Sequence, residues 1–237
     1  MKRTKLICHM MTTLDGKSVG KYEEIHSYPA QLGDYLKIHK RINAHAVIMG
    51  RTTYELMSTD ILQPQLENVE ATPIPRKDFF ADHHKCEKYV VAIDPSGKLI
   101  WTTDQMSLTK DGTYEHIVQI LTEQVSDAYL THLQKIGVSY IFGGKDYLDL
   151  HLVLEKLKSC LSIEDALLEG GGILNGSFLQ QNLIDEMSLF LVPVVDGGTN
   201  AQTIVETLPK YGESFPVEFK LKNIEKLEYG LHLHYGK

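Results

Sequence analysis

Short apolar runs alternate along the chain with segments whose apolar residues recur at helical spacing. The runs predict buried strands and the spaced segments predict helices, because the two patterns match the periods of the two structures. Strands are expected at 5–11, 46–49, 89–93, 116–121, 138–142, 166–168 and 186–195. Helices are expected at 34–44, 53–57, 126–135, 150–160 and 173–181.

This alternation predicts an α/β fold with a mostly parallel central sheet and helices on both faces. The tail differs, because the runs at 217–229 and 231–235 alternate residue by residue and favour an antiparallel hairpin. No repeat or low-complexity linker divides the chain, so residues 1–237 are expected to form a single domain. Residues 63–88 are polar and proline-containing and predict a long surface loop. His83 and His84 lie there, but no partner spacing accompanies them, so no metal site is expected.

Composition narrows the class of protein. The 237 residues are 43% hydrophobic and 23% charged, as in ordinary soluble globular proteins, and the net charge of −7 argues against nucleic acid as a partner. Three widely spaced cysteines are typical of reduced thiols. Neither a membrane-length apolar window nor a secretory leader stands out, so a cytoplasmic protein is expected.

Three predicted strand ends carry residues suited to chemistry: MMTTLDGK, MGRTTY and LLEGGGILNGSF. Ligands of open α/β sheets bind outside the carboxyl ends of the strands. In the third segment, Gly170, Gly171 and Gly172 precede a predicted helix, so backbone N–H groups can approach a phosphate at the positive end of that helix. The same glycines can also serve packing alone.

The segment MGRTTY offers a second phosphate-binding strand end. Gly50 ends the strand, Arg51 supplies a fork-shaped cation, and Thr52 and Thr53 place hydroxyls at a helix start. A capped helix with a surface arginine explains this segment as well. Two such strand ends in one sheet nevertheless favour a ligand with two phosphate groups, such as a dinucleotide.

The combination of motifs resembles a known family. AVIMGRTTYELM is similar to the dihydrofolate reductase segment in which a strand ends in Gly-Arg-x-Thr. TTLDGK, LLEGGGILNGSFL, NLIDEMSLFLVPVVDGG and the closing hairpin together resemble the reductase domain of bifunctional riboflavin-biosynthesis proteins, the RibD C-terminal family. The resemblance extends over nearly the whole chain and implies a dihydrofolate reductase-like fold, NADPH as cofactor and a homodimer.

The resemblance also implies roles for individual residues. The glycines would face the pyrophosphate of the cofactor. Arg51 and Thr53 would contact the phosphates on its adenosine side, and Glu169 would contact the substrate. Glu169 or Asp15 would serve as proton relay or polar anchor for hydride transfer to a ribosylaminopyrimidine. The expected cofactor contacts are Thr12, Thr13, Gly50, Arg51, Thr52, Thr53, Gly170, Gly171 and Gly172. The expected substrate contacts are His9, Asp34 and Glu169.

Some positions depart from the riboflavin pattern. His9 stands where those enzymes have a lysine, and their Asp-Asn-Pro segment is replaced by GRTTYELM. Asp34 either caps the predicted helix at 34–44 or corresponds to the substrate carboxylate of dihydrofolate reductases. Asp94 falls near the expected 2′-phosphate, which a carboxylate would repel. A pterin or another small heterocycle therefore stays an alternative substrate, and a nucleotide-binding protein without turnover is a third hypothesis.

His232 and His234 occupy alternate positions of the last predicted strand and so share one of its faces. A solvent-facing strand accounts for them more simply than a metal site.

Overall fold

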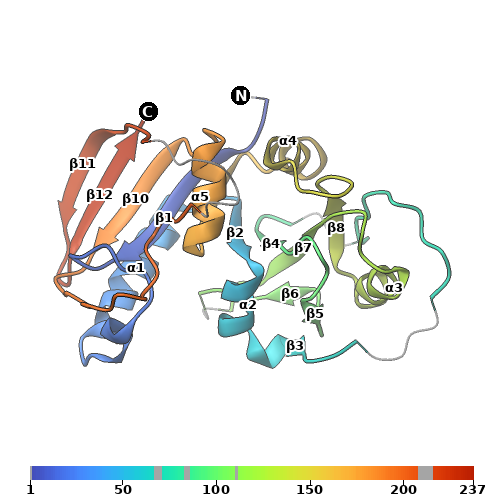
Figure 1. Cartoon of the computed structure of the whole chain (residues 1–237), viewed down its shortest axis with the longest axis horizontal. Helices are drawn as coiled ribbons and strands as arrows, with labels where there is room; N and C mark the ends of the chain where they lie inside the picture. The colour runs from blue at the N-terminus through green and yellow to red at the C-terminus, as the bar shows by residue number, and fades with distance from the viewer. Residues whose placement is uncertain (1, 67–70, 83–85, 110–111, 208–215) are drawn as a thin grey trace. The chain divides into compact units, whose positions relative to one another are not determined.

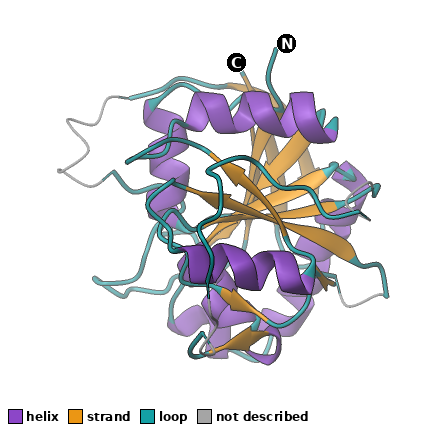
Figure 2. Ribbon diagram, turned by 90° about the vertical axis from the view of Figure 1, so that its right-hand side faces the viewer, coloured by secondary structure: helices purple, strands orange, loops and turns teal. Residues whose placement is uncertain are grey.

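The computed structural model describes residues 2–66, 71–82, 86–109, 112–207 and 216–237. The pair His83 and His84 lies outside these residues. The chain divides into two compact units, and helices and strands alternate in both (Figures 1 and 2). Unit one comprises residues 1–4 and 45–166, and unit two comprises residues 5–44 and 167–237. The expectation of a single domain stays a prediction.

Unit two is built on strands β1 (Lys5–Thr12), β10 (Glu186–Leu191), β12 (Leu231–Gly236) and β11 (Lys220–Lys226). β1 and β10 pair in parallel, whereas β10–β12 and β12–β11 pair antiparallel. The predicted C-terminal hairpin is therefore confirmed. The short strand β9 (Asp165–Leu168), where the chain enters unit two, neighbours β1.

Helix α1 (Tyr28–Ile42) packs its apolar face into the core of unit two. Ile38 is fully buried against Met11 and Phe190. These contacts of Ile38 hold α1 beside β1, the strand that carries His9. The second helix of this unit, α5 (Gly172–Gln180), begins directly after the glycine run.

Unit one contains a parallel set of strands: β2 (Ala46–Gly50), β4 (Tyr89–Ile93), β7 (Glu115–Leu121) and β8 (Ser139–Phe142). Every residue of β4 and β7 is buried, as expected for parallel strands covered on both faces. Three helices accompany them: α2 (Arg51–Met57), α3 (Asp127–Ile136) and α4 (Leu150–Leu161). The predicted α/β class with a mostly parallel sheet is confirmed.

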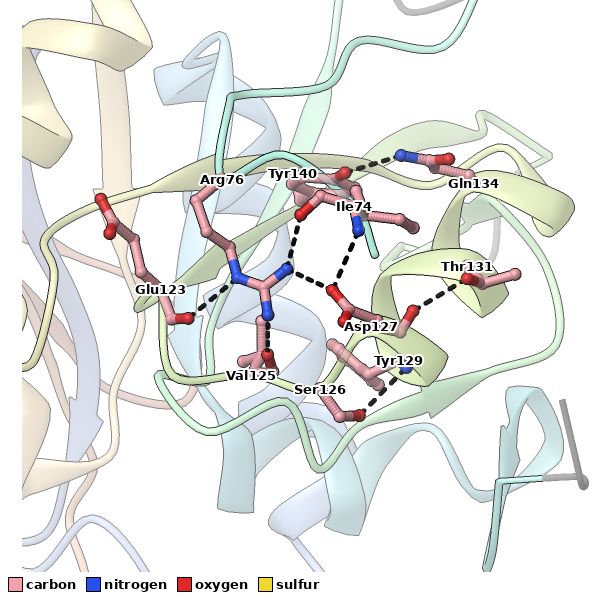
Figure 3. A network of polar contacts seen from close by, with 10 residues as sticks. All are labelled: Ile74, Arg76, Glu123, Val125, Ser126, Asp127, Tyr129, Thr131, Gln134 and Tyr140. Atoms are coloured by element: carbon pink, nitrogen blue, oxygen red, sulfur yellow. Dashed lines mark hydrogen bonds and ion pairs between the residues drawn. The ribbon is translucent and has the colours of Figure 1, made fainter. Parts of the chain in front are cut away.

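The segment before β4 is held by one arginine, as Figure 3 shows. Arg76 donates to the carbonyl oxygens of Ile74, Glu123 and Val125 and forms an ion pair with Asp127 at the start of α3. The pair is partly exposed, so its charge attraction is screened, but the carbonyl bonds give it a fixed geometry. The predicted long loop is thus anchored to α3.

Several predicted boundaries were wrong. α1 begins at Tyr28 rather than residue 34, because Pro29 suits a helix start and Gly33 is tolerated inside. β10 ends at Leu191, before Pro193, which cannot continue the ladder. The pattern also missed the short elements η1 (Lys21–Glu24), η2 (Thr59–Ile61), β3 (Leu62–Gln63), β5 (Ile100–Trp101) and β6 (Gln105–Met106). In the described part of the chain, no helix is both long and apolar enough to cross a membrane.

Candidate active site

Glu169 follows β9 directly and is the central carboxylate of unit two. Only 11% of its side chain is exposed, and its Oε1 accepts a hydrogen bond of 2.7 Å from Nδ1 of His39. Burial acts to raise the pKa of Glu169, but hydrogen bonds from His39 and Tyr35 and the charges of His39 and His9 lower it below its ordinary value. Glu169 is therefore an ionised carboxylate that is held by donors.

His9 lies on β1 and is fully buried. Its Nδ1 is 3.2 Å from the carbonyl oxygen and 3.0 Å from Oγ of Ser188, while its Nε2 is buried without a hydrogen-bond partner. The ring stacks on Tyr35, with centroids 4.2 Å apart and planes at 4°. Burial lowers the pKa of His9 to about 4, despite the opposing charge of Glu169, so the ring is neutral at physiological pH.

Helix α1 brings the remaining members of the cluster together. Tyr35 and His39 are four residues apart and so share one face of the helix. The Tyr35 hydroxyl donates to the main-chain carbonyl of His9, and burial and Glu169 raise its pKa well above the ordinary value. One nitrogen of His9, one of His39 and one oxygen of Glu169 lie within 4.8 Å of one another. Such spacing could admit a metal ion, but the 2.7 Å contact shows His39 and Glu169 hydrogen-bonded to each other.

Asp34 is not the helix cap that was considered for it. It lies in the interior of α1, so the predicted N-cap is wrong; Ser27 precedes the helix. The residue is 2% exposed, and its carboxylate accepts bonds from the backbone N–H of Tyr229 and from Lys37. Asp34 therefore ties α1 to the turn between β11 and β12, and its predicted substrate contact stays a prediction.

Asp15 lies in the loop after β1. Its carboxylate accepts bonds from the Thr13 hydroxyl at 2.6 Å and from the backbone N–H groups of Asp196 and Gly197. These three bonds, led by that from Thr13, lower the pKa of Asp15 to about 2. A group this acidic is ionised at neutral pH, so the bonds favour a loop-fixing role for Asp15 over proton relay. Thr12 and Thr13 are both buried, and the Thr13 hydroxyl also accepts from the Lys17 N–H.

The glycine run divides into two parts. Gly170 has φ +99°, a conformation that favours glycine, and Gly171 caps α5 without any side-chain bond. Gly172 and Gly176 instead allow close packing: a Cβ on Gly172 would lie 2.4 Å from the Thr203 carbonyl oxygen, and one on Gly176 2.0 Å from that of Glu206. The interpretation that all three glycines face a ligand therefore fits Gly170 and Gly171 better than Gly172.

In unit one, Gly50 caps α2, also without a side-chain bond. Arg51 pairs with Glu55 one helical turn further on, and this pair is partly exposed. Thr52 and Thr53 occupy the first turn of the helix. Their predicted phosphate contacts stay predictions.

The helix starts differ in their caps. α3 and α4 are capped by the side chains of Ser126 and Asp149. α2 in unit one and α5 in unit two, the helices that follow the two suspected strand ends, have glycine caps that offer no such oxygen. The first turn of each of these two helices therefore has no side-chain cap, and backbone N–H groups of such a turn suit an anionic group.

Asp94 does not project from the end of β4. Its Oδ2 accepts from the N–H groups of Lys98 and Leu99 and from the Gln119 side chain, and the residue is fully buried. Burial raises its pKa, which further weakens its charge. The repulsion expected between Asp94 and a 2′-phosphate is therefore reduced.

Four residues of the cluster escaped the sequence analysis. Tyr35 and His39 were assigned only to the periodicity of a helix, although their i, i+4 spacing beside a strand with His9 was available as a signal. Ser188 lay unnoticed in an apolar run. His232 was expected to face solvent but is 7% exposed, because β11 and α1 cover it. Of these four residues, Ser188 and His232 are buried, and Tyr35 and His39 are partly buried.

The fold is shared with solved riboflavin-biosynthesis proteins. Over its whole length the chain superposes on 58% of RibD from Acinetobacter baumannii, with a TM-score of 0.65 and 21% identity. It also covers 90% of the Saccharomyces cerevisiae riboflavin biosynthesis reductase Rib7, with a TM-score of 0.61 and 15% identity. The class defined by fold and site is an α/β domain of the RibD reductase type.

The family itself follows from the sequence match. The RibD C-terminal domain matches residues 4–233, so the chain belongs to that family. It is also 37% identical over 82 residues to a protein of Methanothermobacter thermautotrophicus and 31% identical over 116 residues to one of Aquifex aeolicus. Both are named 2,5-diamino-6-ribosylamino-4(3H)-pyrimidinone 5′-phosphate reductase. These matches cover 34% and 49% of this chain and 38% and 48% of the two relatives, respectively.

Proposed function

We propose that the protein is a nicotinamide-dependent reductase acting on a ribosylaminopyrimidine phosphate of riboflavin biosynthesis. The observation that carries the proposal is the buried, ionised Glu169, held by His39 and Tyr35 where β9 meets the glycine turn. The names of the two relatives favour 2,5-diamino-6-ribosylamino-4(3H)-pyrimidinone 5′-phosphate as the substrate, ahead of the corresponding aminouracil.

NADPH is the proposed cofactor, which supplies the hydride when bound. In unit two, the uncapped first turn of α5 would hold a phosphate of this cofactor through backbone N–H groups. Gly170 and Gly171 would let the chain pass close to it. The carboxylate of Asp94 bonds to the backbone of its own turn. The exposed Ser96 and Lys98, which follow the end of β4, would bind a 2′-phosphate.

Glu169 would accept a hydrogen bond from the substrate and so orient the sugar carbon toward the hydride donor. Its low pKa makes it an anchor rather than the proton donor. The reduction also consumes one proton, for which the imidazoles of His9 and His39 beside Glu169 are the candidate carriers. The pterin alternative keeps the segment GRTTYELM as its support, while the carboxylate of Asp34, its second support, is bonded to Tyr229 and Lys37.

Purified protein would be titrated with NADPH and NADH, and absorbance loss of the reduced nicotinamide followed with the diaminopyrimidinone, the aminouracil and dihydrofolate. We expect NADPH to bind more tightly and to be oxidised with the diaminopyrimidinone. Failure of both nucleotides to bind would overturn the cofactor proposal. Binding without oxidation by any of the three substrates would leave a nucleotide-binding protein.

We also propose a homodimer. The apolar strand predicted at 186–195 contains β10. Both edges of β10 are already paired, one with β1 and the other with β12. β11 is the more suitable surface, because it is the outer strand and exposes Leu221 and Ile224. Sedimentation equilibrium of wild type and Ile224→Asp would test this, with dissociation expected only for the variant.

A further inference from the structure

Strands β1, β10 and β12 of unit two lie side by side (Figure 1). A line of buried polar side chains crosses them, formed by His9, Ser188 and His232. His9 and Ser188 are direct partners in the parallel pair of β1 and β10. Their side chains meet at 3.0 Å, between Nδ1 of His9 and Oγ of Ser188. Polar side chains are costly inside a sheet unless they bond to one another, so this line needs a reason beyond packing.

The line continues to β12. Oγ of Ser188 lies 2.8 Å from Nε2 of His232, and Nδ1 of His232 lies 3.6 Å from a carboxylate oxygen of Glu225. Arg41 forms a two-pronged ion pair with the same carboxylate. The side chain of Glu225 is 35% exposed, so this end of the line reaches solvent.

The other end stops at His9. Its Nε2 is buried and has no hydrogen-bond partner among the residues that the structure describes. One nitrogen of His9 lies within 4.8 Å of a nitrogen of His39 and of a carboxylate oxygen of Glu169, the residue proposed to contact the substrate. In the proposed reaction, the unpartnered Nε2 is the atom that would pass a proton to the substrate.

We propose that His232 and Ser188 form a proton path that carries a proton from solvent at Glu225 to His9 and on to the bound substrate. The inference rests on the proposed reductase function. A proton leaves Nε2 of His232 for Oγ of Ser188, the serine's own proton moves to Nδ1 of His9, and the proton on Nε2 of His9 passes to the substrate. One proton enters and one leaves per hydride transferred, which is the balance that the reduction requires.

The hydroxyl of Ser188 suits this task because it can donate and accept at once, and imidazole has a nitrogen on each side. The groups that face His9 are Glu169, His39, Tyr35 and Ser188, with His232 beyond the serine. Those that face His232 are Ser188, Glu225 and Arg41, with His234 on its own strand. Burial, together with the charges of Arg41 and His234, lowers the pKa of His232 against the effect of Glu225.

Turnover provides the first test. Ser188→Ala and His232→Gln should lower kcat about tenfold or more, with KM and NADPH affinity unchanged, whereas Ser188→Thr should keep the path and most of kcat. In the wild type, kcat should fall as pH rises through the pKa of His232. This decrease, the alkaline limb of the pH profile of kcat, should vanish in His232→Gln. If His232 had only a structural role, the variant would have a lower rate but would keep the limb, so a retained limb overturns the path.

His234→Gln is the matched control, because His234 lies on the same strand and pairs with Glu186 at 3.2 Å, outside the path. It should leave kcat and the presence of the pH limb unchanged, and loss of the His234 charge should only move that limb to higher pH. Loss of the limb, as in His232→Gln, would overturn the assignment.

Imidazole ¹⁵N shifts provide the second test and need no turnover. The shifts that report the tautomer of His9 should change in Ser188→Ala and His232→Gln but not in His234→Gln. Identical His9 signals in all four proteins would overturn the path even if the enzyme is active. If the wild type reduces no pyrimidine, the proposed function fails, while the shifts still decide whether the three side chains are coupled.

Discussion

Two carboxylates of unit two, Glu169 and Asp15, follow strand ends and were expected to share the same chemical roles, yet their surroundings differ. Asp15 is exposed and holds its own loop through bonds from Thr13, Asp196 and Gly197. Glu169 is almost buried, and its carboxylate accepts a hydrogen bond from the side chain of His39 on α1. One carboxylate fixes backbone, and the other is fixed by side chains from a helix.

The two loops therefore depend on different interactions. The turn after Glu169 is held by backbone packing: Gly172 and Gly176 lie against residues 203–206, and the Glu206 N–H donates to the Gly172 carbonyl. The bonds that hold this turn do not involve the Glu169 carboxylate, whose hydrogen bond comes from His39. The difference shows that a carboxylate can bind a ligand or take part in a reaction only where other interactions, here backbone packing, hold its loop.

The largest effect is expected for Glu169→Gln. Loss of the charge should lower kcat/KM about 10²–10⁴-fold, because the anchor and the charge beside His39 and His9 are both removed. Thermal unfolding should change little. Steady-state kinetics would check this, and a variant with wild-type turnover would show that the buried carboxylate is not part of the site.

Gly172→Val should destabilise the protein by about 1–3 kcal/mol, because the new side chain meets the Thr203 carbonyl oxygen. Gly171→Val, in contrast, should weaken NADPH binding more than folding. Gly33→Ala in α1 is the control: a Cβ there meets nothing within 4 Å, and stability should rise by about 0.4–1 kcal/mol. Denaturant unfolding and nucleotide titration would separate the two glycine roles; equal effects of the first two variants would erase the distinction.

The neutral His9 predicts an acid-sensitive site. Its pKa is lowered to about 4 in the fold, while the unfolded value is about 6.5, so the unfolded state binds the extra proton between these limits. Stability is therefore full above pH 6.5 and falls by up to about 1.4 kcal/mol per unit as the pH decreases toward 4. His9→Asn should flatten this part of the stability curve, as measured by urea unfolding at several pH values. Parallel curves for both proteins would contradict it.

The smallest effect is expected for Asp15→Asn. The pKa of Asp15 is lowered to about 2, so its contribution to stability is present above its unfolded pKa and is lost as the pH falls toward 2. The variant should be slightly less stable than the wild type at neutral pH and equal to it at the acid limit. Turnover should remain close to wild type. A loss of kcat as large as that of Glu169→Gln would remove the contrast between the two carboxylates.

The sequence by itself determined the class of fold and the order of its elements. A continuous apolar run such as 89–93 indicates a strand that is buried on both faces, and the alternation at 231–235 indicates one that is buried on one face. Both patterns can be seen in a short stretch of sequence. The motifs around Glu169 were enough to indicate the family. Glu169 could be selected because a carboxylate and glycines at a strand end are adjacent in sequence.

Only the tertiary structure decided which polar residues meet. His9, His39, Ser188 and His232 come from four elements, and their partners are up to 191 residues away along the chain. Periodicity assigns each residue to a face but not to a neighbour, because register and helix docking are set by packing of the whole unit. For the same reason the sequence alone predicts neither the bond between Asp34 and Tyr229 nor the bonds from the N–H groups of Asp196 and Gly197 to Asp15.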